Sequence, residues 1–194
     1  MGLIASLKRL VRGGSAKARP DTPKFAADTP VERLYAGVVA EARQPGWYVE
    51  GGVPDTLDGR FDMVVLVLSM LLLRLEEVTG GNPRHPAAQL SADLADRFLT
   101  DMEGNLRQDG IGDQVVPKHL GQMMAALGGR LGAYRAARGD NEAMADALQR
   151  NLLRGGMVSD AALLWLGNAT RALSERLSAT SFARLAAGEW EADR

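Results

Sequence analysis

The chain contains 194 residues, of which 46% are hydrophobic and 24% charged, and its formal net charge is −1. This composition is ordinary for a soluble globular protein, and the length suits one domain with a substantial core. The absence of cysteine excludes disulfide bonds and thiolate metal sites. Only two histidines, His85 and His119, are present, which argues against a transition-metal site.

The first 25 residues differ in charge from the rest of the chain. Six basic residues against one acidic residue give this segment a net charge of +5, so residues 26–194 carry −6. Apolar residues recur among the basic ones at helical spacing, which is typical of a short helix lying on an anionic membrane. The residues predicted to contact the membrane are Leu3, Ile4, Leu7, Lys8, Arg9 and Arg12. The alternative is a disordered basic tail; in both cases residues 1–25 form a tail and linker, and residues 26–194 form the folded domain.

The most apolar segment runs from Met63 to Leu73 and includes one polar residue, Ser69. A helix that is apolar on every side must be buried on every side. We therefore predict an all-α fold, a single domain of six to seven helices around a central helix over about 57–78. Thr56 is the expected N-cap, because its hydroxyl can accept from a free backbone N–H of the first turn. The apolar run is too short to cross a bilayer, which needs about 20 residues.

The other helices are predicted from their caps and breaks. A capping box over residues 29–32 begins one helix, which stops before Pro45, and residues 47–49 form an irregular connection. The next helix after the central one opens at Pro86 and ends in a glycine-rich, acidic segment over 108–113. The remaining helices are expected over about 117–138, from Asp140 to about Arg154, from Ser159, and from Thr180 or Ser181.

The helix over 117–138 carries a row of small residues, namely Gly121, Ala125, Gly128, Gly132 and Ala136. Small residues at this spacing allow another helix to approach closely. We expect this face to pack against another helix of the same chain, and the alternative is a groove for a partner helix.

A loop shaped by glycine and proline begins at Gly51 and leads into the central helix. We call it the charged loop, because it carries Asp55, Asp58, Arg60 and Asp62. Asp58 lies in the first helical turn, where the helix dipole favours a carboxylate, and Asp62 projects from the same face. We expect each of the two to have its own cationic or backbone partner. Together with Asp55 and Arg60, these residues either pin the helix or also form a recognition surface, because loops held by a rigid scaffold often bind other molecules.

The sequence lacks the motifs of phosphate-binding and dinucleotide-binding loops, zinc sites and nucleophile elbows. Basic charge is confined to the tail and aromatic residues are scarce, which argues against nucleic-acid binding. We therefore predict a binding protein with no catalytic residues and no cofactor. An alternative is a haem-binding or haem-delivery protein, since His119 lies near Met123 and Met124 in the sequence.

Two groups of residues carry a family pattern, and the loop motif in the first group is long and specific. The first is Ala42-Arg43-Gln44-Pro45, Trp47-Tyr48 and Gly52-Val53-Pro54-Asp55-Thr56-Leu57-Asp58-Gly59-Arg60-Phe61-Asp62. The second is Phe98, Asp101-Met102, Asn105-Leu106-Arg107, Gly110-Ile111-Gly112-Asp113, Lys118, Met123 and Tyr134. Over roughly residues 31–134 the chain resembles the ubiquinol–cytochrome c chaperone family.

The resemblance implies a non-enzymatic assembly factor for ubiquinol–cytochrome c reductase, respiratory complex III, whose client protein is newly made cytochrome b. The compact length and the lack of a long presequence indicate a bacterial member, and the basic N-terminal helix is expected to keep it at the inner, cytoplasmic face of the cytoplasmic membrane. Whether a second chaperone subunit takes part is left open. A membrane-surface scaffold without a specific client is a further alternative. The residues interpreted as partner-binding are Pro54, Asp55, Asp58, Arg60, Asp62, Asp101, Arg107 and Asp113.

Overall fold

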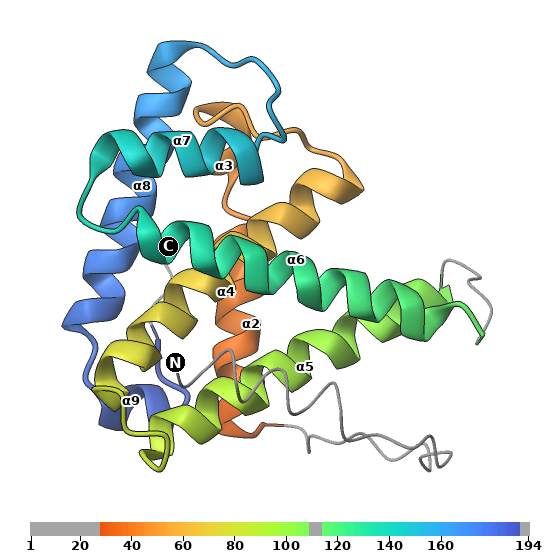
Figure 1. Ribbon diagram of the computed structural model, residues 1–194, viewed down its shortest axis with the longest axis vertical. Helices are drawn as coiled ribbons and strands as arrows, with labels where there is room; N and C mark the ends of the chain where they lie inside the picture. Colours follow the sequence, from red (N-terminus) through yellow and green to blue (C-terminus); the bar gives the residue numbers. More distant parts are fainter. Residues whose placement is uncertain (1–27, 109–113, 191–194) are drawn as a thin grey trace.

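The computed structural model describes residues 28–108 and 114–190, and this part of the chain contains α-helices and no strands. The helices are α2 (Pro30–Ala42), α3 (Pro45–Val49), α4 (Leu57–Thr79), α5 (Pro86–Gln108), α6 (Val116–Ala136), α7 (Asn141–Asn151), α8 (Asp160–Ala179) and α9 (Phe182–Ala186) (Figure 1). All except the five-residue α3 and α9 have eleven residues or more. The predicted all-α class is confirmed, and the predicted membrane-contact residues of the tail lie outside the described residues.

Helix α4 is the centre of the domain and packs against α2, α5, α6 and α8 (Figure 1). Between Met63 and Leu73 every residue except Val64 is buried. The one polar side chain of this run, Ser69, donates from its hydroxyl to the carbonyl oxygen of Val65 at 2.6 Å, so its burial leaves no donor unpaired. Each buried leucine of α4 contributes about 1.5–3 kcal/mol relative to an exposed one. The predicted central helix is confirmed.

The caps explain where the helices begin. The Thr56 hydroxyl accepts from the Gly59 N–H at 3.1 Å, as predicted. The Thr29 hydroxyl accepts from the Glu32 N–H at 3.2 Å, but the Glu32 carboxylate accepts from Arg97 of α5 at 2.8 Å, so this carboxylate ties α2 to α5. The side chains of Asp140, Ser159 and Ser181 accept from first-turn N–H groups of α7, α8 and α9.

The prediction of an irregular connection over residues 47–49 is wrong, because these residues belong to the short helix α3. Pro45 ends α2 and also occupies the first position of α3, where its fixed φ suits a helix and its missing N–H leaves nothing unpaired. The turn buries Trp47, whose indole N–H donates to the carbonyl oxygen of Glu41 at 3.0 Å.

Helices α5 and α6 lie side by side and run in opposite directions (Figure 1). The expectation that the small residues of α6 pack against another helix is wrong. Among the described residues, no side chain or other element comes within 4 Å of the position that a Cβ would take at Gly121, Gly128 or Gly132. The larger residues of α6, such as Leu127 and Leu131, face the core instead.

None of the helices in the described ranges combines the length and the apolar character needed to span a bilayer. This agrees with the sequence, in which the apolar run of α4 is short and ends at charged residues. The apolar surface of α4 is covered by neighbouring helices of the same domain.

Candidate functional site

A cleft of about 1150 Å³ opens beside the start of α4. Its walls are the charged loop with the first turns of α4, the end of α2 with α3, the second half of α5 and the first half of α6. The apolar lining residues are Val39, Ala42, Pro45, Val49, Leu57, Phe61, Val64, Met102, Leu106, Met123 and Ala126. Two of them, Val49 and Leu57, are 75% and 76% exposed at the rim, so apolar surface continues from the cleft to the outside of the molecule.

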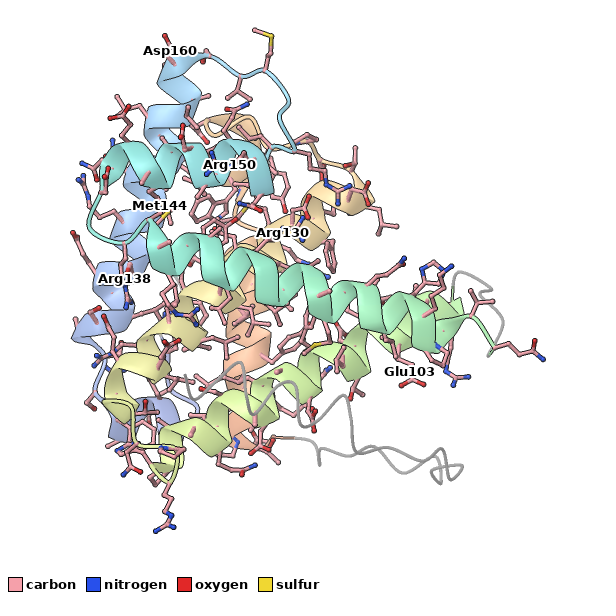
Figure 2. The ribbon with its side chains drawn as sticks, in the orientation of Figure 1. Glu103, Arg130, Arg138, Met144, Arg150 and Asp160 are labelled. Carbon is pink, nitrogen blue, oxygen red and sulfur yellow. The ribbon has the colours of Figure 1, made fainter. Side chains whose placement is uncertain are left out.

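A buried carboxylate holds the charged loop in place. Asp62 is 1% exposed, and its oxygens accept from Arg130 of α6 and from Nε of Arg154, each at 2.6 Å. Arg154 also donates to Asp58 at 2.7 Å. Arg130 stands on the side of α6 that faces α7 and the start of α4 (Figure 2). We call Asp58, Asp62, Arg130 and Arg154 the Asp62 cluster; it joins α4, α6 and the segment after α7.

The expectation that Asp58 and Asp62 have separate partners is wrong, because both accept from Arg154. The hydrogen bond to Asp62 raises the pKa of Arg154 above its ordinary value. Arg154 has a φ of 52°, in the left-handed region, which costs a residue with a Cβ about 1 kcal/mol or more. Its bonds to the two carboxylates offset this strain and keep the segment between α7 and α8 against α4.

The other two carboxylates of the cleft also have partners within the protein. Asp55 and Arg60 form an exposed ion pair at 2.6 Å, and the hydrogen bond from Arg60 lowers the pKa of Asp55. Asp101 accepts from the Tyr35 hydroxyl at 3.0 Å and lies 3.7 Å from Arg97. Burial, and then the charge of Asp101, raises the pKa of Tyr35, so this phenol stays a neutral donor.

A different part of the lining has hydrogen-bonding side chains that are not engaged. These are Asn105 and Gln108 on α5 and His119 and Gln122 on α6. None of the four side chains forms a hydrogen bond with another residue in the described ranges. Arg43, at the end of α2, also lines the cleft and has no carboxylate of the described residues within ion-pair distance. We call these five residues the polar wall.

The structure brings together part of the predicted partner-binding set. Asp55, Asp58, Arg60 and Asp101 line the cleft, and Asp62 is buried behind it. Pro54 is exposed on the loop, while Arg107 is exposed and pairs with Glu103 at 3.0 Å. Neither is among the lining residues, and Asp113 lies outside the described residues. The role of these residues in partner binding stays a prediction.

Sequence reasoning missed the two arginines of the Asp62 cluster. The sequence signal was the pair of like charges four residues apart, Asp58 and Asp62, which indicates that cationic partners lie nearby. Those partners are arginines 68 and 92 residues away from Asp62 in the sequence, and no local pattern identifies them.

The residues considered for haem separate in the structure. His119 and Met123 line the cleft, while Met124 is 7% exposed in the core. Within the described ranges, no cluster of three or more histidine, aspartate or glutamate side chains is placed to hold a metal ion.

Comparison with known proteins gives two matches. The sequence profile of the ubiquinol-cytochrome C chaperone family matches residues 49–192, which is most of the chain. The crystal structure of the Cbp3 homolog from Brucella abortus is 34% identical to this chain, with a TM-score of 0.72 over 85% of this chain and 89% of that one. None of the curated proteins compared matches the sequence. The profile match includes the charged loop and all of helices α4 to α9, and the chain belongs to the ubiquinol–cytochrome c chaperone family.

Proposed function

We propose that this protein is a non-enzymatic chaperone in the assembly of ubiquinol–cytochrome c reductase, and that its client is newly made cytochrome b. The observation that carries the proposal is the family match over residues 49–192, supported by the 34% identity to the Cbp3 homolog. A chaperone for a membrane subunit must cover surface that the mature complex buries, and that surface is largely apolar.

The lining of the cleft supports this task. Met102 and Met123 lie in its lining, and methionine adapts its shape to different apolar partners. The exposed rim residues Val49 and Leu57 extend the apolar area that a client could cover. Burial of apolar surface contributes about 25 cal/mol for each Å² removed from water. We propose that the client binds in the cleft, with the charged loop as one of its walls.

The proposed place of action is the inner face of the cytoplasmic membrane. The segment that would make this contact is the basic tail with Leu3, Ile4, Leu7, Lys8, Arg9 and Arg12. Each basic residue near an anionic membrane contributes about 1 kcal/mol to binding. Deletion of residues 2–12 should therefore shift the protein from the membrane fraction to the soluble fraction, and an unchanged distribution would contradict the membrane role of the tail.

The test of the function is an affinity pull-down of the tagged full-length protein from detergent-solubilised membranes of its own host. Cytochrome b recovered without the other subunits of the mature reductase supports the proposal. A second chaperone subunit would be identified by mass spectrometry in the same sample. The control is the variant Glu175→Lys, which changes an exposed residue of α8 outside the cleft lining. It should capture the same proteins as the unchanged chain. Recovery of soluble proteins alone, or of none, contradicts the proposal.

Haem binding is a second candidate, favoured by one observation, the presence of both His119 and Met123 in the cleft lining. The absorption spectrum of protein purified from haem-replete cells tests it. A Soret band that is lost in His119→Ala would support haem binding, and the absence of a Soret band would contradict it.

A further inference from the structure

We infer that the cleft recognises the C-terminal end of an apolar helix, and that the polar contacts come from the polar wall instead of the charged loop. The inference rests on the proposed function, because such a helix end would belong to the membrane-embedded client. It differs from a recognition surface formed by the charged loop, which is the alternative that the sequence suggests.

The charged loop is poorly suited to bind a basic segment, because its carboxylates are already occupied. Asp62 is buried between two arginines, and Asp58 accepts from Arg154 at 2.7 Å. Asp55 is paired with Arg60 at 2.6 Å. At each of these positions a lysine or arginine of a client would meet a carboxylate whose negative charge is already offset by an arginine of the protein itself. The loop therefore forms a wall whose charges are balanced internally.

The polar wall, in contrast, presents donors that no described residue engages. Asn105 and Gln108 are three residues apart on α5, so they project from one face, and His119 and Gln122 have the same relation on α6. Each amide carries two N–H donors, and the guanidinium of Arg43 carries five. The amides can also accept, but Arg43, at the end of α2 on another part of the lining, adds a positive charge that favours acceptors and negative charge in the cleft.

The C-terminal end of a helix has the complementary chemistry. Its last four carbonyl groups have no partner within the helix, and the helix dipole places a partial negative charge there. The N-terminal end of a helix offers N–H donors and a partial positive charge, which Arg43 would repel. The apolar side chains of the same helix end would pack against Phe61, Met102 and Met123 in the lining.

The size of the cleft agrees with this occupant. Two turns of a helix about 10 Å across, with a pitch of 5.4 Å, occupy roughly 850 Å³. The cleft holds about 1150 Å³, so two such turns with their side chains fit and leave space for a few waters. Two turns contain the four unpaired carbonyl groups together with the residues next to them, so the whole polar end can enter.

Two synthetic peptides test the inference with the full-length protein. Both are 14-residue helices of leucine, alanine and α-aminoisobutyric acid, and they differ in which end carries a bulky fluorescent label. The peptide labelled at its N-terminus leaves the C-terminal carbonyl groups accessible, and we expect fluorescence anisotropy to show that it binds at least about tenfold more tightly than the other. Equal affinities, or tighter binding of the peptide with the free N-terminal end, would overturn the inference.

Variants of exposed residues assign the contacts within the cleft. We expect Arg43→Ala and Gln122→Ala each to weaken binding of the first peptide by about tenfold. The matched control Arg150→Ala removes an exposed, paired arginine of α7 that is not among the lining residues, and should leave the affinity unchanged. A loss in Arg60→Ala with none in Gln122→Ala would show that the charged loop makes the contacts, and would refute the inference. Circular dichroism spectra confirm that each variant is folded.

The peptide assay and the pull-down fail independently. If cytochrome b is captured but the peptides do not distinguish their ends, the chaperone function stands and the inference falls. If the peptides behave as expected but cytochrome b is not captured, the recognition chemistry stands and the proposed client is wrong.

Discussion

Replacement of the buried carboxylate in Asp62→Ala should strongly destabilise the protein. The change leaves Arg130, whose side chain is 12% exposed, without its charged partner. Removal of one partner from a buried ion pair costs about 3–5 kcal/mol. We expect the lower limit, about 3 kcal/mol, because Arg154 is 47% exposed and keeps its bond to Asp58. For a chain of this length, that loss lowers the melting temperature by about 6–12 °C.

Urea unfolding at pH 7, followed by circular dichroism at 222 nm, measures this loss. The control is Asp58→Ala, which removes a carboxylate with a 71% exposed side chain and should cost less than about 1 kcal/mol. Asp62→Asn keeps an acceptor oxygen without the charge, so its stability should lie between those of wild type and Asp62→Ala. A loss below about 1 kcal/mol in Asp62→Ala, equal to that in the control, would refute the structural role of the cluster.

Three further results are expected. Gly59→Ala places a Cβ against the carbonyl oxygen of Pro54 and should lower the free energy of unfolding by about 3 kcal/mol. Gly129→Ala, on the open face of α6, should instead raise the free energy of unfolding by about 0.5–1 kcal/mol in the same urea assay. Equal changes in the free energy of unfolding for the two variants would contradict the described packing. Because Arg60 lowers the pKa of Asp55, the stabilisation from this pair is present at neutral pH and is lost as the pH falls through the lowered pKa. NMR titration of the Asp55 carboxyl should therefore show a higher pKa in Arg60→Ala, and an unchanged pKa would rule out the pair in solution.

Local sequence signals account for much of the helical framework. The apolar run from Met63 to Leu73 predicts a buried central helix, and Thr56 begins it where an N-cap is expected. These features depend on residues close together in the sequence, so they can be predicted without knowledge of the rest of the fold. From the sequence, Pro45 indicates only the end of a helix, although the same residue also begins α3.

The small residues of α6 show the limit of such signals. Their spacing indicates that a helix could approach closely, but it does not indicate whether a helix is available to do so. The larger apolar residues of α6 are buried against α4 and determine which face of α6 packs there. The glycines therefore lie on the opposite, open face.

The candidate site could be predicted only in part for a related reason. The charged loop is one continuous motif, so Asp55, Asp58 and Arg60 were identified together. The polar wall is formed by residues of separate helices, with Asn105 on α5 and Gln122 on α6. These residues line one cleft because α5 and α6 lie side by side. The arginines of the Asp62 cluster come from still more distant parts of the chain, and only the tertiary fold shows that they meet one carboxylate.

Photo-cross-linking in the native host tests most directly whether the cleft holds the client. Benzoylphenylalanine incorporated in place of Gln122 would lie in the cleft lining, while the same group in place of Glu175 would lie on the exposed side of α8. We expect irradiation to link cytochrome b to the protein at the first position and not at the second. No link at either position, or equal links at both, would contradict the proposal that this cleft holds cytochrome b during assembly.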